Sequence, residues 1–523
     1  MIKLRKIFFY LFLTIYIGFC PLVILYALGL RVNTNTKSIQ KTGIISVSTI
    51  PPEADVTLNQ RHFPKRTPTI IRNLPPGNYS LTLSLKNYLP WKKTLTVKEK
   101  KATTVENVLL IPQKWKSREL FAESFEELIP ITGQPFLLLI GLSQIKDVGE
   151  VQYKDLSSLE KRPNIDYLNV FSREKVNKKG PLLKDIFIFR WSQGIGQALF
   201  ANNTLTSDAE TIQPIFQKDF IYREGKLRNY YTSKNSPFLL LPVQLGDAIK
   251  YLWIDPRTKP PQVEDITDLF PMEPDNVLWD PREDKLIFSR QRQSINRLNI
   301  KSKAILPNIL EAVRNFSIFG DQLYVLTNDY TFKRVDSDAK NVQILLEDSP
   351  LSRSLFGGQD ELRRVGITVL TKELILFLDE NGALLFNHLP HRLVDRGVKG
   401  FVFNEHKKRL LIWTNQQIGV IDFTKEKGNA LFEQGPPLTW PITNGNNIQQ
   451  AFWVNETSQI LYRDEDKIFL LEADEGESLS YEIIGIRPNS AIEYSDTLGT
   501  LFYLDKETGH LSSIEILKIP HAI

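Results

Sequence analysis

The chain has 523 residues, 42% of them hydrophobic, and a formal net charge of +5. This apolar content is ordinary for a globular protein, and the length predicts about three domains, or one small domain and one large repeat domain. A single cysteine excludes an intramolecular disulfide and a cysteine-based metal site.

The charge is unevenly distributed. Residues 1–42 carry six basic and no acidic side chains, and residues 43–112 carry ten basic and four acidic ones. Subtracting these two segments from the overall charge leaves −7 for residues 113–523. The basic segment 1–112, named the basic collar below, therefore precedes the acidic segment 113–523. No nucleic acid partner is predicted.

Residues 7–30 contain no charged side chain. A helix needs about 20 apolar residues to cross roughly 30 Å of hydrocarbon. Lys3, Arg5 and Lys6 precede the segment and only Arg31 follows closely, so the positive-inside tendency predicts a cytoplasmic N-terminus. We expect a single-pass protein of the cytoplasmic membrane, with residues 1–42 as stub, signal-anchor helix (7–30) and polar spacer, and the rest extracytoplasmic.

Three alternatives compete with this anchor. A buried core helix is rarely so long. A cleaved signal peptide has the same basic and apolar order, but this apolar core is too long and no Ala-x-Ala-like site follows it. Gly18-Phe19-Cys20 faintly resembles a lipoprotein cleavage site, but Phe19 stands where a small residue is needed. Cys20 is therefore interpreted as a lipid-facing or packing residue.

Residues 43–112 alternate between apolar and polar side chains in several short runs, such as residues 45–48 and 80–85. Period-2 alternation is typical of strands that are buried on one face. Turn residues separate the runs at Pro51-Pro52, Thr67-Pro68 and Pro75-Pro76-Gly77. The segment is predicted to be a small β-sandwich.

The same segment resembles the PEGA domain family through an ordered set of motifs: Gly43-Ile44-Ile45-Ser46-Val47, Pro51-Pro52-Glu53-Ala54-Asp55-Val56, Thr67-Pro68, Leu74-Pro75-Pro76-Gly77-Asn78-Tyr79 and Asn87-Tyr88. Two positions depart from the family pattern. The glycine before Ala54 is missing, so we expect that turn to close differently, and Asn87 replaces a glycine but tolerates the same left-handed conformation. The resemblance implies a non-catalytic extracytoplasmic spacer or adhesion module.

Beyond a predicted linker at residues 113–118, a pattern recurs in residues 119–523. An aromatic residue, an Asp or Asn, a polar turn and an apolar trio follow one another, and the trio ends nine positions after the aromatic. The trios are Leu286-Ile287-Phe288, Leu410-Leu411-Ile412, Ile460-Leu461-Tyr462 and Leu501-Phe502-Tyr503, with weaker copies around residues 323–326 and 374–377. The mean period from Phe288 to Tyr503 is 43 residues.

Such a period is typical of β-propeller blades, and we expect each trio to form an inner strand. The pattern is similar to TolB-like and quinoprotein-like propellers, and the length predicts seven or eight blades. The alternative is a β-rich chain with coincidental aromatics. The predicted fold is thus mainly β: a transmembrane helix, a PEGA-like sandwich and a propeller.

No segment carries a catalytic signature. Gly194-Ile195-Gly196 lacks the third glycine and the helix of a dinucleotide-binding loop and is interpreted as a hairpin turn. His388 and His391 flank Pro390, which disfavours a helical metal site. The acidic runs 464–466 and 474–477 lack the ligand order of an EF-hand and are interpreted as solvated turns. Trp279, Trp413 and Trp453 are interpreted as blade packing. No cofactor or metal is predicted.

The favoured function is a non-catalytic envelope scaffold or binding protein whose ligand is a protein or a cell-wall polymer. The alternative is a membrane-tethered propeller hydrolase or lyase with catalytic residues from several blades. The candidate binding residues are cations of the collar, expected to contact anionic lipid headgroups or wall polymer: Arg61, Lys65, Arg66, Lys92, Lys93, Lys98, Lys100 and Lys101.

Overall fold

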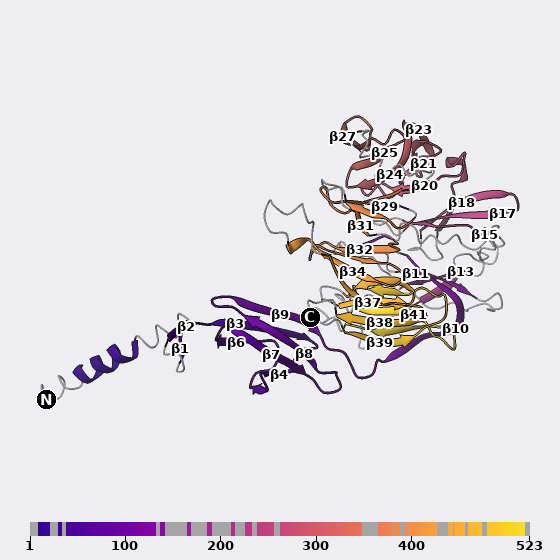
Figure 1. Cartoon of the computed structure of the whole chain (residues 1–523). Coiled ribbons are helices and arrows are strands. Elements are labelled where there is room, and N and C mark those ends of the chain that lie inside the picture. Colours follow the sequence, from indigo (N-terminus) through magenta and orange to yellow (C-terminus); the bar gives the residue numbers. More distant parts are fainter. Residues whose placement is uncertain are drawn as a thin grey trace. The chain divides into compact units, whose positions relative to one another are not determined.

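The computed structural model describes residues 9–20, 30–33, 38–131, 136–141, 165–168, 186–190, 211–214, 225–232, 238–255, 262–347, 365–379, 381–386, 393–395, 397–425, 438–442, 444–454, 459–472 and 479–517. These residues fall into two compact units, Met1–Lys116 and Ser117–Ile523 (Figure 1). The boundary lies within the stretch 113–118 that the sequence suggests as a linker. Each unit has its own hydrophobic core.

The N-terminal helix is described for residues 9–20. Its large apolar side chains are 39–71% exposed: Phe9, Tyr10, Leu11, Phe12, Leu13, Ile15, Tyr16, Ile17 and Phe19. No helix in the described part of the chain has the length and hydropathy needed to cross a membrane. Residues 7–8 and 21–29 of the predicted span lie outside the described residues.

The end of that span and the spacer differ from the prediction. Leu30 belongs to strand β1 (Leu30–Asn33), which pairs antiparallel with β2 (Ser38–Lys41). Val32 and Ile39 are partners in this ladder, and β-branched residues favour strands. The segment expected to be a plain polar spacer therefore contains a two-stranded ladder.

Residues 43–109 form the predicted β-sandwich. One sheet has the order β6 (Thr69–Leu74), β3 (Gly43–Ile50), β9 (Ala102–Leu109), and the other has the order β5 (Arg61–Phe63), β4 (Asp55–Leu58), β7 (Gly77–Ser84), β8 (Trp91–Val97). Alternate residues of β3, such as Ile45 and Val47, are buried. They pack with Val56 and Leu83 of the opposite sheet in one apolar core, as period-2 alternation predicts.

The pairing of β3 with β9 sets the positions at which the chain enters and leaves the sandwich. These strands are parallel, with Ile44 opposite Ala102 and Ile50 opposite Leu109. The chain therefore enters at one end and leaves at the other, about 20 Å away at ~3.3 Å per residue. The backbone NH of Gln113 donates to the carbonyl of Asn87 (2.9 Å) and holds the departing chain at the far end.

The described residues of the second unit form seven antiparallel sheets, one of which is divided into two blades where a long strand changes partners, and we number the resulting eight blades in chain order. Blade 1 contains residues 125–130 of β10 (Ser117–Pro130), β11 (Phe136–Gly141), β13 (Ile186–Arg190) and β14 (Thr211–Pro214). Blade 2 contains β15 (Lys226–Leu227), β16 (Tyr231–Thr232), β17 (Leu239–Leu245), β18 (Ala248–Asp255) and β19 (Gln262–Asp265). Blade 3 contains β20 (Asn276–Trp279), β21 (Leu286–Gln291), β22 (Ser294–Asn299) and β23 (Ala304–Leu310), and blade 4 contains β24 (Val313–Phe319), β25 (Gln322–Thr327), β26 (Phe332–Asp336) and β27 (Val342–Leu346).

Blade 5 contains β28 (Val365–Val369), β29 (Ile375–Asp379), β30 (Leu384–Phe386) and β31 (Leu393–Asp395). Blade 6 contains β32 (Gly400–Asn404), β33 (Arg409–Trp413), β34 (Ile418–Asp422) and β35 (Leu438–Ile442), and blade 7 contains β36 (Ile448–Trp453), β37 (Gln459–Asp464), β38 (Lys467–Glu472) and β39 (Ser480–Gly485). Blade 8 contains β40 (Glu493–Ser495), β41 (Thr500–Leu504), β42 (His510–Glu515) and residues 117–124 of β10. A further strand, β12 (Ile165–Leu168), pairs with β32. Two short 3₁₀ turns, η2 (Thr267–Leu269) and η3 (Phe423–Lys425), follow β19 and β34.

The long strand β10 closes the ring of blades. Its residues 117–124 pair with β42, the last strand of the chain, and its residues 125–130 pair with β11. Phe125 and Leu137 of blade 1 share an apolar core with Phe502 of blade 8. The N-terminal strand thus completes the last blade and starts the first.

Each of the other neighbouring blades is also joined to the next. Shared cores connect blades 1 to 7 in succession. Blade 7 is joined to blade 8 by Gln450, whose side chain accepts from the backbone NH of Ile492 (2.9 Å) and donates to its carbonyl (3.2 Å). Together with the closure at β10, these contacts form a closed cycle of eight blades, the topology of a β-propeller.

The recurring sequence pattern corresponds to the first hairpin of a blade. Trp279 ends the first strand of blade 3, and the trio 286–288 lies in its second strand, between two neighbours. Trp279, Trp413 and Trp453 are 4%, 3% and 1% exposed, which confirms their prediction as blade packing. The polar residue after the aromatic closes the hairpin, since Asn404 accepts from the backbone NH of Lys407 (3.0 Å).

Candidate functional site

The turns that carry the family-like motifs are held by buried hydroxyls. Thr67 is 1% exposed, and its hydroxyl accepts from the backbone NH of Ala54 (3.0 Å). The backbone NH of Glu53 donates to the carbonyl of Thr67 (2.8 Å). The Pro51-Pro52 turn and the Thr67-Pro68 segment therefore depend on each other, although about 13 residues separate them.

Two positions without glycine still adopt a glycine-like backbone. Glu53 has φ of 68° and Asn87 has φ of 69°, both in the left-handed region that glycine favours. Tolerance of this conformation by Asn87 is confirmed. The expectation that the turn before Ala54 closes in another way is wrong, because Glu53 itself takes the left-handed conformation.

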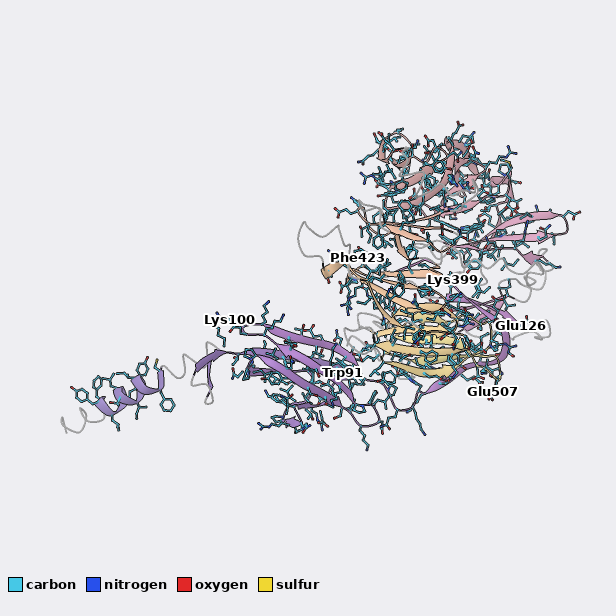
Figure 2. The ribbon with its side chains drawn as sticks, in the orientation of Figure 1. Trp91, Lys100, Glu126, Lys399, Phe423 and Glu507 are labelled. Carbon is cyan, nitrogen blue, oxygen red and sulfur yellow. The ribbon has the colours of Figure 1, made fainter. Side chains whose placement is uncertain are left out.

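The structure gathers three of the eight predicted cations at the end where the chain enters the sandwich. Lys98, Lys100 and Lys101 are exposed in the turn between β8 and β9. The backbone NH of Lys100 donates to the carbonyl of Thr42 (3.0 Å), and that of Ile44 donates to the carbonyl of Lys101 (3.2 Å). This basic turn is therefore bonded to the start of β3 and to the residue before it. Figure 2 shows Lys100 at the end of the sandwich away from Trp91.

The other five predicted cations lie elsewhere on the sandwich. Arg61 is on edge strand β5, whereas Lys92 and Lys93 are on β8, the opposite edge of the same sheet. Lys65 and Arg66 follow β5, and the Arg66 guanidinium pairs with the Asp55 carboxylate (3.0 Å). The eight cations therefore do not form one continuous surface.

A groove of about 490 Å³ lies on the outer face of the sheet β6–β3–β9. Its lining residues are Ser46, Val47, Ser48, Lys65, Pro68, Thr69, Ile70 and Arg72. The sequence reasoning included Lys65 but missed Arg72. Alternation in β6, where Thr69 and Ile71 are buried and Ile70 and Arg72 are exposed, is the signal that places Arg72 on the outer face.

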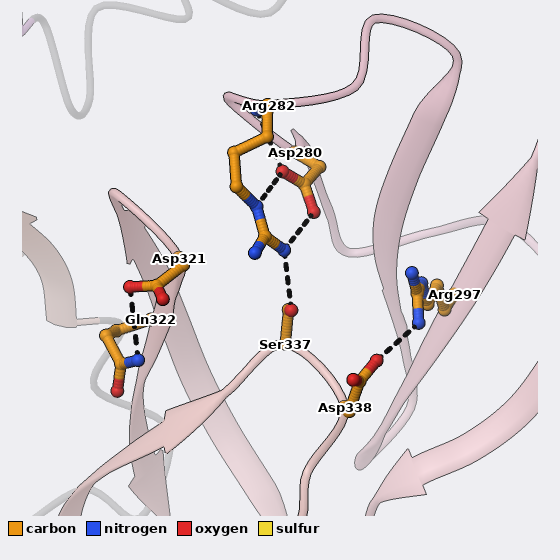
Figure 3. Close-up of polar contacts among 7 residues, drawn as sticks. All are labelled: Asp280, Arg282, Arg297, Asp321, Gln322, Ser337 and Asp338. Carbon is orange, nitrogen blue, oxygen red and sulfur yellow. Dashed lines mark hydrogen bonds and ion pairs between the residues drawn. The ribbon is translucent and has the colours of Figure 1, made fainter.

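A polar cluster joins blades 3 and 4 (Figure 3). The Arg282 guanidinium contacts the Asp280 carboxylate through two hydrogen bonds (3.1 and 3.2 Å) and donates to the Ser337 hydroxyl (2.6 Å). Asp280 is buried, and its hydrogen bonds raise the pKa of Arg282. Nearby, Arg297 pairs with Asp338 (2.9 Å). Every carboxylate named here has a protein donor, so the cluster links blades and offers no vacant ligand set.

The first carboxylate of the acidic run 464–466, Asp464, also has hydrogen-bond donors within the protein. The Asp464 carboxylate accepts from the backbone NH groups of Asn446 (3.1 Å) and Asn447 (2.6 Å), so it closes a turn. Among the described residues, no group of three or more His, Cys, Asp or Glu is arranged to hold a metal ion. Residues 194–196, 474–477, His388 and His391 lie outside the described residues.

Comparison with known families agrees with the sandwich assignment. Residues 42–111 match the family model of the PEGA domain. We use this name for the sandwich below. No curated protein matches the chain.

Three solved structures are similar to part of this chain at low identity. The Cps50 (Swd1) β-propeller domain of Myceliophteria thermophila is 11% identical, with 56% of this chain and 99% of that chain covered and a TM-score of 0.32. YCF48 from Cyanidioschyzon merolae is 10% identical, with coverages of 56% and 95% and a TM-score of 0.34. An oligogalacturonate lyase in complex with manganese is 9% identical, with coverages of 55% and 89% and a TM-score of 0.33. The ring closure through β10 carries the propeller assignment independently of these likenesses.

Proposed function

We propose that this protein is a membrane-anchored extracytoplasmic scaffold, in which the PEGA domain spaces a propeller binding head away from the membrane. The observation that carries the proposal is the parallel pairing of β3 and β9. A domain that receives the chain at one end and releases it at the other acts as a spacer.

The N-terminal helix supports the anchor. Residues 9–20 present exposed apolar side chains on all sides of the helix, and a helix that is hydrophobic all round is suited to a protein core or a bilayer. With residues 7–30 free of charge, lipid is the environment that matches this surface. The positive-inside tendency then directs both folded units to the extracytoplasmic side.

The basic turn supports contact of the PEGA domain with the membrane surface. Lys98, Lys100 and Lys101 lie at the end where the chain enters from the anchor. A lysine near an anionic lipid surface contributes about 1 kcal/mol, and the effect fades beyond a Debye length of about 8 Å. Three lysines would orient an anchored domain without holding it alone.

Membrane fractionation tests the proposal. The full chain, expressed in a bacterial host, should stay in the pellet after an alkaline carbonate wash, and a variant lacking residues 1–37 should be released as a folded protein. N-terminal sequencing should give the intact start. A mature chain that begins at Cys20 or near Val32, or a full chain extracted by carbonate, would contradict the anchor.

A further inference from the structure

We propose that the groove on the β6–β3 face of the PEGA domain binds an extended acidic polysaccharide, with Lys65 and Arg72 as the charge contacts. The site goes beyond the proposed function, because it gives the PEGA domain a ligand of its own. It does not require the anchor, because the groove lies entirely within the PEGA domain.

The floor of the groove is formed by small hydroxyl side chains of β3. Ser46 lies opposite Ile70 in the β3–β6 ladder, so the short serine is flanked by a longer side chain that is 45% exposed. The Ser48 hydroxyl accepts from the backbone NH of Asn107 (2.8 Å), which leaves its own proton available to a ligand. Ser46 and Ser48 are two residues apart on one strand and thus about 7 Å apart on one face.

The cations lie toward opposite ends of this floor. Lys65 comes from the connection that precedes the first residue of β6, and Arg72 lies three residues beyond that first residue, about 10 Å along the strand. No acidic partner occurs for either cation among the ion pairs of the described residues, whereas the adjacent Arg66 is paired with Asp55. The two available charges therefore suit a ligand that carries more than one anion.

The arrangement favours a polysaccharide over a lipid surface. The groove runs along the side of the domain, between Lys65 and Arg72, while the membrane-directed lysines lie in the β8–β9 turn. Hydroxyl donors between two cations match a chain that presents hydroxyls and carboxylates alternately, because a guanidinium binds carboxylate in a bidentate manner. The lining also includes the apolar residues Pro68 and Ile70, so it is the placement of the hydroxyls and cations that favours a polysaccharide.

The test uses the full chain in neutral detergent micelles and alginate as the probe, with binding measured by calorimetry at low salt. Wild-type protein should bind alginate, lose binding as salt rises to a few hundred millimolar, and ignore neutral dextran. The double variant Lys65→Gln/Arg72→Gln should bind at least about tenfold more weakly. The matched control Lys86→Gln/Lys114→Gln removes the same charge from exposed positions outside the groove and should change affinity less than twofold.

Three results would overturn the assignment. They are absence of alginate binding by the wild type at low salt, equal weakening by both double variants, and tighter binding of polyphosphate or anionic vesicles at the same two residues. Circular dichroism of each variant verifies that it is folded, and Ser46→Ala offers a milder change with an expected loss of a few-fold. Loss of alginate binding with intact carbonate resistance would refute the groove alone and leave the anchored scaffold standing.

Discussion

Removal of the closing strand should unfold the whole propeller and not one blade alone. Truncation after Gly509 deletes β42 and thereby unpairs residues 117–124 of β10 and the outer side of β41. It also deletes four apolar side chains that are 0–6% exposed: Leu511, Ile514, Ile516 and Leu517. At about 1.5–3 kcal/mol for each buried side chain, the loss is roughly 6–12 kcal/mol.

This loss is comparable to the whole stability of a typical domain, about 5–15 kcal/mol. Because every blade packs against two neighbours, an opened ring also exposes the core shared by Phe125 and Phe502. We therefore expect no cooperative transition in the truncated protein.

Tryptophan fluorescence during urea unfolding shows directly whether the truncated protein has a cooperative transition. Trp253, Trp279, Trp413 and Trp453 are buried in blades 2, 3, 6 and 7, outside the closing blade. In the truncated protein their emission should already resemble that of the unfolded chain without urea. A control truncated after Leu517 keeps every contact described above and should melt as the full protein does. A native-like cooperative transition in the protein truncated after Gly509 would refute the reasoning.

Three further predictions concern the membrane-facing end, the PEGA motif and alkaline stability. Residues 38–116 should sediment with anionic vesicles at low salt. Joint substitution of Lys98, Lys100 and Lys101 by Glu should abolish this sedimentation, since each lysine contributes about 1 kcal/mol to binding. Sedimentation that survives the substitution would show that the basic turn is not the part that binds the vesicles. Thr67→Val removes the buried acceptor for the Ala54 NH and should destabilise the PEGA domain by about 1–3 kcal/mol in urea unfolding, whereas the exposed control Thr96→Val should cost less than about 0.5 kcal/mol. Burial raises the pKa of Tyr494 well above its ordinary value, so the folded state keeps it neutral where the unfolded chain ionises. The contribution of neutral Tyr494 to the free energy of unfolding is therefore fully present below about pH 10 and should be lost as the pH rises above it. A spectrophotometric titration in which all tyrosines of the folded protein ionise near pH 10 would contradict this.

Local patterns predict much of the fold. Alternation in β3 and β7 predicts the sandwich, and the confirmed burial of Ile45, Val47, Leu81 and Leu83 follows from it. The aromatic-to-trio spacing predicts repeated hairpins because each blade repeats the same first turn. The blade number predicted from length, seven or eight, includes the eight blades formed by the described residues.

Long-range pairing is the part that sequence patterns do not predict. β10 begins at Ser117, inside the predicted linker, and its partner β42 is almost 400 residues away in the chain. Its pattern is also irregular, because the strand changes partners between Ser124 and Phe125. The parallel pairing of β3 with β9 is likewise invisible in alternation, which is identical for parallel and antiparallel neighbours. The positions of the basic side chains in space are not predicted for the same reason. The order of charges along the chain does not indicate that Lys92 and Arg61 lie on opposite edges of one sheet.

Labelling with a membrane-impermeant maleimide tests the anchored scaffold most directly. In a Cys20→Ser background, one variant carries Lys3→Cys before the anchor and another carries Lys301→Cys at an exposed position between β22 and β23. In spheroplasts, the account predicts that Lys301→Cys is labelled at once and that Lys3→Cys is labelled only after the membrane is permeabilised. Protection of Lys301→Cys, or equal labelling of both positions without permeabilisation, would contradict it.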